Sequence, residues 1–88
     1  MKNSDEKMVG ICIEWLSYQT VIKTMNMRRS SYGLKHIVEK WAGTYVSNDS
    51  FIEAVKRTGV PYKQLKNSPN IAVAISEKTI KRCQEYKP

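Results

Sequence analysis

Four apolar residues at helical spacing constrain the fold of this chain more than any other feature of its sequence. They lie at positions i, i+3, i+4 and i+7, namely Leu34, Ile37, Val38 and Trp41. This spacing places four apolar side chains on one stripe of a helix. Ser30 or Ser31 can cap the start of that helix, and Gly43 stands where a left-handed residue would end it. We therefore expect an amphipathic helix over residues 32–42, with its apolar stripe facing a core.

A second helix is expected after a short connector. Ser50 and Glu53 match the S-x-x-E capping box, although Ser47 would begin the helix one turn earlier. The apolar face of this helix would consist of Phe51, Ile52, Ala54 and Val55. Gly59 then provides a stop. The pattern predicts a helix over residues 48–58.

The residues that follow indicate a β-hairpin and a last helix. Two extended segments, 60–65 and 70–75, flank four turn-forming residues. Pro61 has no N–H to donate, so the first strand is expected at an edge of the sheet. Ser76 can cap a basic helix that occupies residues 77–86.

The N-terminal part of the chain allows two interpretations. Apolar residues recur at steps of three and four, which predicts a helix within residues 5–26, either continuous or interrupted. An alternation of apolar residues over 9–13 would instead allow a short strand, but the length of the segment favours the helix. The helix is apolar around more than one face, so we expect it either beneath the other helices or in a homodimer seam through residues 8–22. Residues 1–4 are expected to fray.

The order of these elements resembles that of winged helix-turn-helix domains, and residues 32–75 carry the resemblance. It implies a single domain over residues 1–88 that is mainly α with a small β-hairpin, with four helices and one hairpin. In such domains the second helix of the pair, here residues 48–58, lies against the major groove of DNA, and the wing contacts the backbone or the minor groove. The function that this resemblance implies is a DNA-binding regulator of transcription or of a mobile element.

Charge is distributed unevenly along the chain. Fifteen lysines and arginines against eight acidic residues give a formal net charge of +7. Residues 1–22 hold two lysines and three acids, a net charge of −1, whereas residues 23–88 hold thirteen bases and five acids, a net charge of +8. A basic unit of this kind favours an anionic partner, and duplex DNA is the partner we expect. A solvated cationic surface without a ligand is the alternative.

The candidate nucleic-acid interface combines cations with polar side chains. The cations expected to contact phosphates are Arg28, Arg29, Lys35, Lys56, Arg57, Lys63 and Lys66. The polar residues assigned to the same interface are Ser47, Asn48, Ser50 and Asn67. Asp49 and Glu53 oppose this assignment, because their carboxylates would face phosphates near the start of the groove-reading helix. They favour a second hypothesis, a non-enzymatic adaptor or inhibitor that binds a protein partner.

Metal, enzyme and membrane functions find little support in the sequence. Cys12 and Cys83 are 71 residues apart and His36 is the one histidine, which does not fit the ligand spacing of a structural zinc site. A disulfide between the two cysteines is conceivable, but we expect reduced thiols in a cytoplasmic protein. The sequence has no phosphate loop, paired-acid motif or nucleophile elbow, so we expect neither an enzyme nor a cofactor. The longest apolar stretch, residues 8–16, is interrupted by Glu14 and is too short to cross a bilayer.

Overall fold

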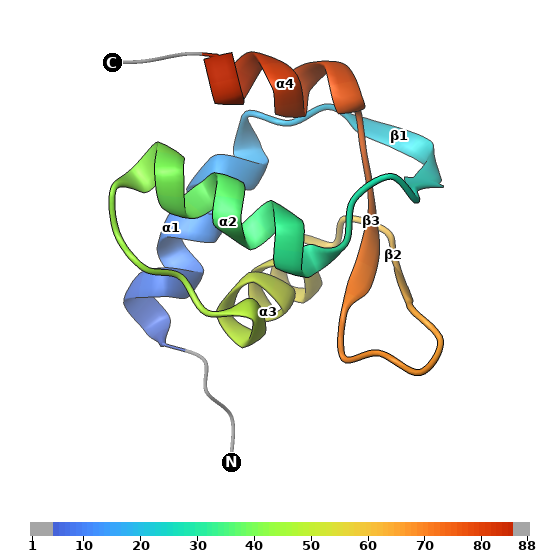
Figure 1. The fold of residues 1–88 in the computed structure, drawn as a ribbon, viewed down its shortest axis with the longest axis horizontal. Coiled ribbons are helices and arrows are strands. Elements are labelled where there is room, and N and C mark those ends of the chain that lie inside the picture. Colours follow the sequence, from blue (N-terminus) through green and yellow to red (C-terminus); the bar gives the residue numbers. More distant parts are fainter. Residues whose placement is uncertain (1–4, 86–88) are drawn as a thin grey trace.

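Helices and strands follow one another in mixed order along the part of the chain that the structure describes. The computed structural model describes residues 5–85, with side chains placed up to Arg82. Its elements are α1 (Glu6–Ser17), β1 (Val21–Asn26), α2 (Ser31–Ala42), α3 (Asn48–Thr58), β2 (Tyr62–Gln64), β3 (Ile71–Ile75) and α4 (Glu77–Glu85) (Figure 1). Four helices and a three-stranded antiparallel sheet therefore make up a mixed α/β fold. The expected fraying of residues 1–4 lies outside the described residues.

Helices α1, α2 and α3 lie on one side of the molecule and the sheet on the other (Figure 1). Figure 1 shows α1, α2 and α3 packed together on the left, the strands on the right, and α4 lying across the top. The loop between β2 and β3 projects at the lower right. All five residues of β3 are buried, as expected for the central strand of a sheet that packs against helices.

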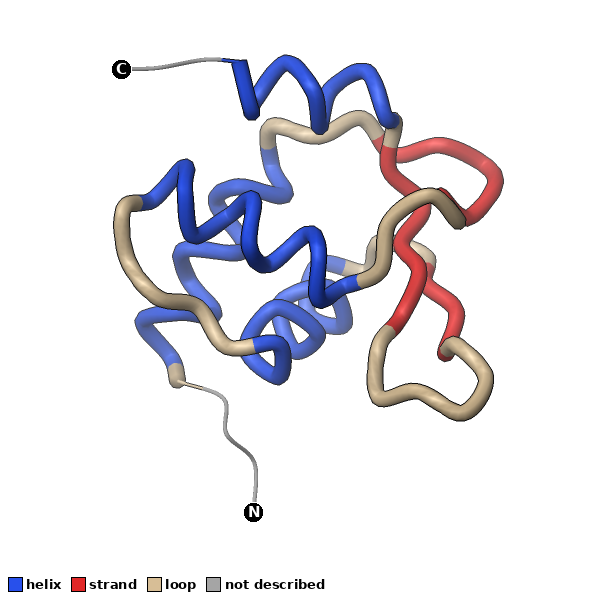
Figure 2. Tube along the Cα trace, in the orientation of Figure 1, coloured by secondary structure: helices blue, strands red, loops and turns tan. Residues whose placement is uncertain are grey.

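The sheet has the order β1-β3-β2, so β3 pairs with a strand on each side. β2 pairs with β3 in regular antiparallel register along its whole length. β1 pairs with β3 at its two ends, where Val21 lies opposite Ile75 and Asn26 opposite Val73. Residues 22–25 arch away from the sheet between these two pairs, as the red arch at the upper right of Figure 2 shows. The edge formed by β1 is therefore strongly bulged.

The helix predicted within residues 5–26 occupies the first half of that range as α1, and the second half forms β1. α1 ends where the N–H of Gln19 donates to the carbonyl of Leu16, three residues back, and tightens the last turn. The carbonyl of Thr20 then accepts a hydrogen bond from the N–H of Ser76 at 2.8 Å, which leads the following residues into the sheet as β1. The predicted two-stranded hairpin is accordingly part of a three-stranded sheet.

Local capping signals predicted α2 and α3 to within one residue. Ser30 and Ser47 each accept a hydrogen bond from the backbone N–H three residues further along the chain. Gly43 and Gly59 end the two helices with φ angles of 73° and 77°. This left-handed conformation is costly for residues with a Cβ, which explains why glycine stands at both ends.

Apolar side chains from the helices and from β3 form one core. Trp15 and Phe51 are its two largest fully buried side chains, and their rings meet edge to face with centroids 6.1 Å apart. This ring pair joins α1 to α3. The alternative of a strand over residues 9–13 is wrong, because they lie in α1, where Cys12 is fully buried. The predicted stripe of α2 faces the same core, although Trp41 at its end is half-buried.

Candidate nucleic-acid interface

Residues 65–70 connect β2 to β3, and we call them the wing loop. Hydrogen bonds close this loop at its base, because the side-chain amide of Gln64 donates to the carbonyls of Ser68 at 2.7 Å and of Asn70 at 2.9 Å. Asn67 adopts a φ of 58° near the tip, in the left-handed region that asparagine tolerates better than most residues. The loop therefore has a defined shape, and Asn67 lies exposed on it.

Two helices are tied to the end of this loop. Asn48, the first residue of α3, donates from Nδ2 to Oδ1 of Asn70 at 2.9 Å. Ser31, the first residue of α2, is fully buried, and its Oγ accepts a hydrogen bond from the N–H of Ile71 at 3.0 Å. The first turns of both helices and the wing loop therefore meet in one corner of the molecule. Asn70 was not among the predicted site residues, and no local signal in the sequence distinguishes it.

Four of the seven predicted cations are exposed and form no ion pair with a carboxylate among residues 5–82. They are Arg28, Lys56, Lys63 and Lys66. Lys63 lies on β2 and Lys66 in the wing loop, while Lys56 lies on α3. Arg28 follows the arch of β1. Each of these side chains can meet an anion without breaking an ion pair of the fold.

Arg29, in contrast, is held by Glu77 at the start of α4. Its Nη2 lies 2.6 Å from Oε2 of the carboxylate, and its Nε donates to both carboxylate oxygens at 3.0 Å. Asn26 donates to the same carboxylate from Nδ2, also at 3.0 Å. The hydrogen bonds from Arg29 outweigh partial burial and, with the Asn26 amide, lower the pKa of Glu77 to about 2. The charge of Arg29 therefore fastens the end of β1 to α4.

Arg57 is engaged by two glutamates. Its Nη2 lies 2.7 Å from Oε2 of Glu6 on α1, and its Nε donates to Oε2 of Glu53 at 2.9 Å. The hydrogen bonds raise the pKa of Arg57 above its usual value, and the guanidinium lowers the pKa of Glu6. Arg57 and Glu6 are exposed, so these ion pairs contribute little to stability. They nevertheless occupy a guanidinium that the sequence assigned to phosphate contact.

Lys35 is almost completely buried, with 5% of its surface exposed. Its Nζ lies 3.2 Å from Oε2 of Glu39, and it sits 5.3 Å and 4.8 Å from the ring centroids of Tyr32 and Tyr45. Both distances fall within the range of cation–π attraction. The ammonium group is therefore enclosed by one carboxylate and two aromatic rings, and is not presented to solvent as phosphate contact requires.

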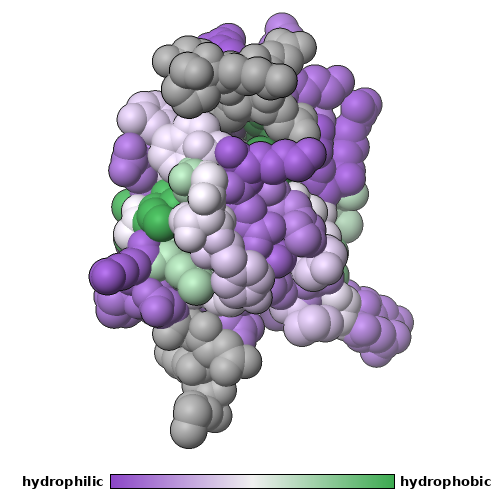
Figure 3. Space-filling model, turned by 60° about the vertical axis from the view of Figure 1, so that its left-hand side comes forward, coloured by the Kyte–Doolittle hydropathy of each residue, from purple (hydrophilic) through white to green (hydrophobic). Residues whose placement is uncertain are grey.

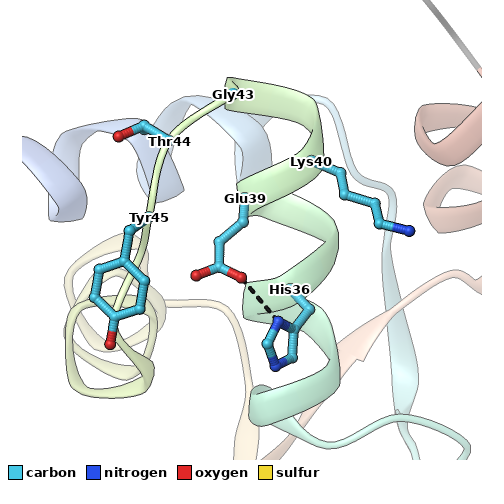
Figure 4. Close-up of a pocket in the computed structure, with 6 residues that line it drawn as sticks. All are labelled: His36, Glu39, Lys40, Gly43, Thr44 and Tyr45. Carbon is cyan, nitrogen blue, oxygen red and sulfur yellow. Dashed lines mark hydrogen bonds and ion pairs between the residues drawn. The ribbon is translucent and has the colours of Figure 1, made fainter.

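An open pocket of about 390 Å³ lies beside this lysine. Figure 4 shows His36 and Glu39 on α2 and, across from them, the ring of Tyr45 in the α2–α3 connector. Nδ1 of His36 lies 2.8 Å from Oε1 of Glu39, and Oε2 accepts a hydrogen bond from the N–H of Val46 at 3.1 Å. Burial alone would raise the pKa of Glu39, but the Val46 N–H and the side chains of Lys35 and His36 lower it. Oε2 thus holds the connector against α2, while Oε1 pairs with His36 within the helix.

The polar residues predicted for the start of α3 serve the fold. Ser47 caps the helix by accepting from the N–H of Ser50 at 3.1 Å. Ser50 is fully buried, and its Oγ accepts from the N–H of Asp5 at 3.0 Å, which joins α3 to the cap of α1. Asn48 is bonded to the wing loop, as described above. Of the four predicted polar residues, Asn67 is the one that lies exposed.

The expected homodimer seam through residues 8–22 is covered in large part by the chain itself. The buried residues of α1 are Val9, Cys12, Trp15 and Leu16. Tyr18 and Val21 are more than half exposed and remain accessible to a partner. On the face drawn in Figure 3, apolar surface gathers in one small area among hydrophilic side chains. Dimerisation through this segment stays a prediction.

The structure also describes the surroundings of Cys12, the possible metal ligands and the apolar character of the helices. Cys12 is free and buried, and burial raises the pKa of its thiol to about 12, which suppresses the reactive thiolate. The side chain of Cys83, and with it the conceivable disulfide, lies outside the described residues. Within residues 5–82, no three potential metal-ligating side chains gather in one place. None of the described helices combines the length and the apolar character that crossing a membrane requires.

Comparison with family models, with curated proteins and with solved structures finds no match for this chain. A functional hypothesis for it therefore depends on the geometry and the charges described above. At the corner formed by the first turn of α3 and the wing loop, exposed Lys66 lies in a loop of defined shape, and Lys63 lies on the adjoining strand β2.

Proposed function

We propose that this chain binds duplex DNA through the wing loop and the exposed side of α3, in the manner of a winged helix-turn-helix domain. The observation that supports this most directly is the arrangement of elements. A helix pair, α2 and α3, is followed by the β2–β3 hairpin, and β1 completes a sheet of order β1-β3-β2. The Asn48–Asn70 hydrogen bond then couples the start of α3 to the wing loop, so that both would approach a duplex as one unit.

The four unpaired cations supply the electrostatic part of the proposal. If Arg28, Lys56, Lys63 and Lys66 each neutralise one phosphate, the slope of log K against log salt is about −3.6. A slope of about −6 would require all seven predicted cations. The ion pairs of Arg29, Lys35 and Arg57 would then have to open, so the smaller slope is the expected one.

Titration of a labelled duplex at several salt concentrations tests the proposal. We expect binding at about 50 mM salt that weakens with the smaller slope. The double substitution Lys63→Ala/Lys66→Ala should reduce the slope by about 2 and lower the affinity by about tenfold or more. The matched control, Lys40→Ala/Lys78→Ala, removes the same charge from exposed sites on α2 and α4 and should change the affinity much less. Absence of binding at about 50 mM salt, or equal effects of the two double substitutions, would overturn the proposal.

A protein-interaction module is the second candidate, and exposed aromatic residues favour it. Tyr18, Tyr32 and Tyr45 are each more than half exposed. Tyrosine is enriched at protein interfaces, where its ring buries a large area and its hydroxyl stays hydrogen-bonded. Capture from a nuclease-treated lysate, with wild-type protein and with Tyr45→Ser, tests this candidate. A protein partner that survives the nuclease and is lost with Tyr45→Ser supports an adaptor, and the absence of any such partner counts against it.

A further inference from the structure

The polar side chains of α3 are almost all engaged within the protein. Asn48 donates to Asn70, and Ser50 is buried against the cap of α1. Arg57 is bound by two glutamates, and Thr58 donates from its hydroxyl to the carbonyl of Val55 in its own helix at 3.0 Å. Base recognition in a groove depends on side chains such as arginine, asparagine or serine that can meet base edges. On this helix each of those side chains already has a partner.

Two charged residues of α3 are exposed and form no ion pair within residues 5–82, and they have opposite effects. Asp49 lies in the first turn, the part of the helix that would enter a groove first, and it would repel the phosphates on either side. Lys56 lies near the other end of the helix and is the one unpaired long-chain donor among the described residues of α3. A single lysine can contact a phosphate but cannot distinguish one base pair from another over a whole site.

The strongest attraction therefore comes from outside α3. Lys63 and Lys66 are on the hairpin, and Arg28 follows β1, so three of the four unpaired predicted cations lie beyond the groove-reading helix. Lysine on a loop or an edge strand reaches phosphate oxygens, which are the same in every sequence.

We propose that this interface binds the sugar–phosphate backbone of duplex DNA without reading base sequence, and that Asp49 limits how deeply α3 enters a groove. The inference rests on the proposed function, because it describes how the same corner would treat its ligand. The ligand class is duplex DNA of any sequence.

Selection from a random-sequence duplex library, followed by affinity measurement, tests this inference with the full chain. We expect no enriched motif, and affinities for A·T-rich, G·C-rich and mixed duplexes of equal length that agree within about tenfold at one salt concentration. A selected sequence that binds more than about tenfold more tightly than the others would overturn the inference and leave DNA binding intact. Absence of binding to every duplex would instead overturn the proposed function.

Substitution of Asp49 tests its role separately. Asp49→Asn removes a charge from the first turn of α3 and should tighten binding to all of these duplexes by about two- to threefold. Glu14→Gln is the matched control, because Glu14 is an exposed carboxylate in α1 and the charge change is identical. Thermal unfolding of both variants checks that the fold is retained. Equal affinities of the two variants, or tightening for one sequence alone, would contradict the role we assign to Asp49.

Discussion

The side-chain amide of Asn48 donates to the side-chain carbonyl of Asn70 across 2.9 Å, and so joins the first residue of α3 to the last residue of the wing loop. The two residues are 22 positions apart in the sequence. The Gln64 side chain and the bond from the Leu65 N–H to the Asn70 carbonyl close the wing loop on itself, whereas the Asn48–Asn70 bond joins the loop to α3. An interface made of α3 and the wing loop depends on that connection.

Asn70→Ala should loosen the wing loop without unfolding the protein. The substitution keeps the backbone carbonyl that accepts from Gln64 and removes the bond to Asn48. We expect a loss of about 1 kcal/mol in the free energy of unfolding, faster amide exchange over residues 65–70, and weaker DNA binding. Asn67→Gly is the control, because glycine adopts a φ of 58° without strain. Identical behaviour of the two variants would show that the Asn48 bond does not position the loop.

The neighbours Lys56 and Arg57 should respond differently to alanine substitution. Lys56 is exposed and unpaired, so Lys56→Ala should weaken DNA binding several-fold and reduce the salt slope by about 1, with unchanged stability. Arg57 is bound by Glu6 and Glu53, so Arg57→Ala should change affinity little and reduce stability slightly. Affinity titrations and thermal unfolding measure both effects. A larger loss of affinity with Arg57→Ala than with Lys56→Ala would mean that its ion pairs open on binding.

The Arg29–Glu77 ion pair should make stability sensitive to acid. The pKa of Glu77 is lowered to about 2 in the folded protein, from a usual value of 4.5. The ionised carboxylate therefore stabilises the fold above pH 4.5, and this contribution is lost as the pH falls from 4.5 towards 2. After allowance for partial exposure we expect it to be about 2 kcal/mol. Urea unfolding of wild type and Glu77→Gln at pH 7, 4 and 3 should show stabilities that converge in acid, and parallel curves would rule this out.

An element could be predicted from the sequence where the residues that determine its bounds lie close together along the chain. α2 and α3 are delimited by caps and glycines within a few residues of their ends, so their bounds were predictable. β1 was not, because Val21 and Asn26 pair with residues about 50 positions later and the segment between them bulges. An alternation of exposed and buried residues, the usual strand signal, is absent from such an arch.

The same distinction applies to the candidate site. The Lys35–Glu39 and Glu53–Arg57 pairs have i,i+4 spacing on helices and were in principle visible in the sequence. The partner of Arg29 is 48 residues away, and the second partner of Arg57 is 51 residues away. No sequence pattern indicates which cations are neutralised by distant carboxylates. The seven predicted phosphate contacts therefore included three cations that the fold itself uses.

The fold should lose more stability when buried Lys35 loses its partner Glu39 than when an exposed cation loses its carboxylate partner. The side chains of the two residues are 7% and 17% exposed, so the Glu39→Gln substitution leaves an ammonium group with little solvent and no counter-charge. We expect it to reduce the free energy of unfolding by about 2 to 3 kcal/mol, and Lys35→Met by about 1 kcal/mol, since methionine can fill the space between the two tyrosines. The double variant should cost at least about 1 kcal/mol less than the sum, because neither charge is then left alone.

His36→Gln is the control for this cycle. His36 contacts the same carboxylate, but its side chain is 49% exposed, so the substitution should change the free energy of unfolding by less than about 0.5 kcal/mol. Urea unfolding at pH 7 measures all four variants on one scale. Additive effects of Glu39→Gln and Lys35→Met would contradict the coupling, because independent residues add whereas the members of a buried ion pair do not. A non-additive result would show that Lys35 stabilises the α2–α3 connector through Glu39, and that its charge is not available to a ligand.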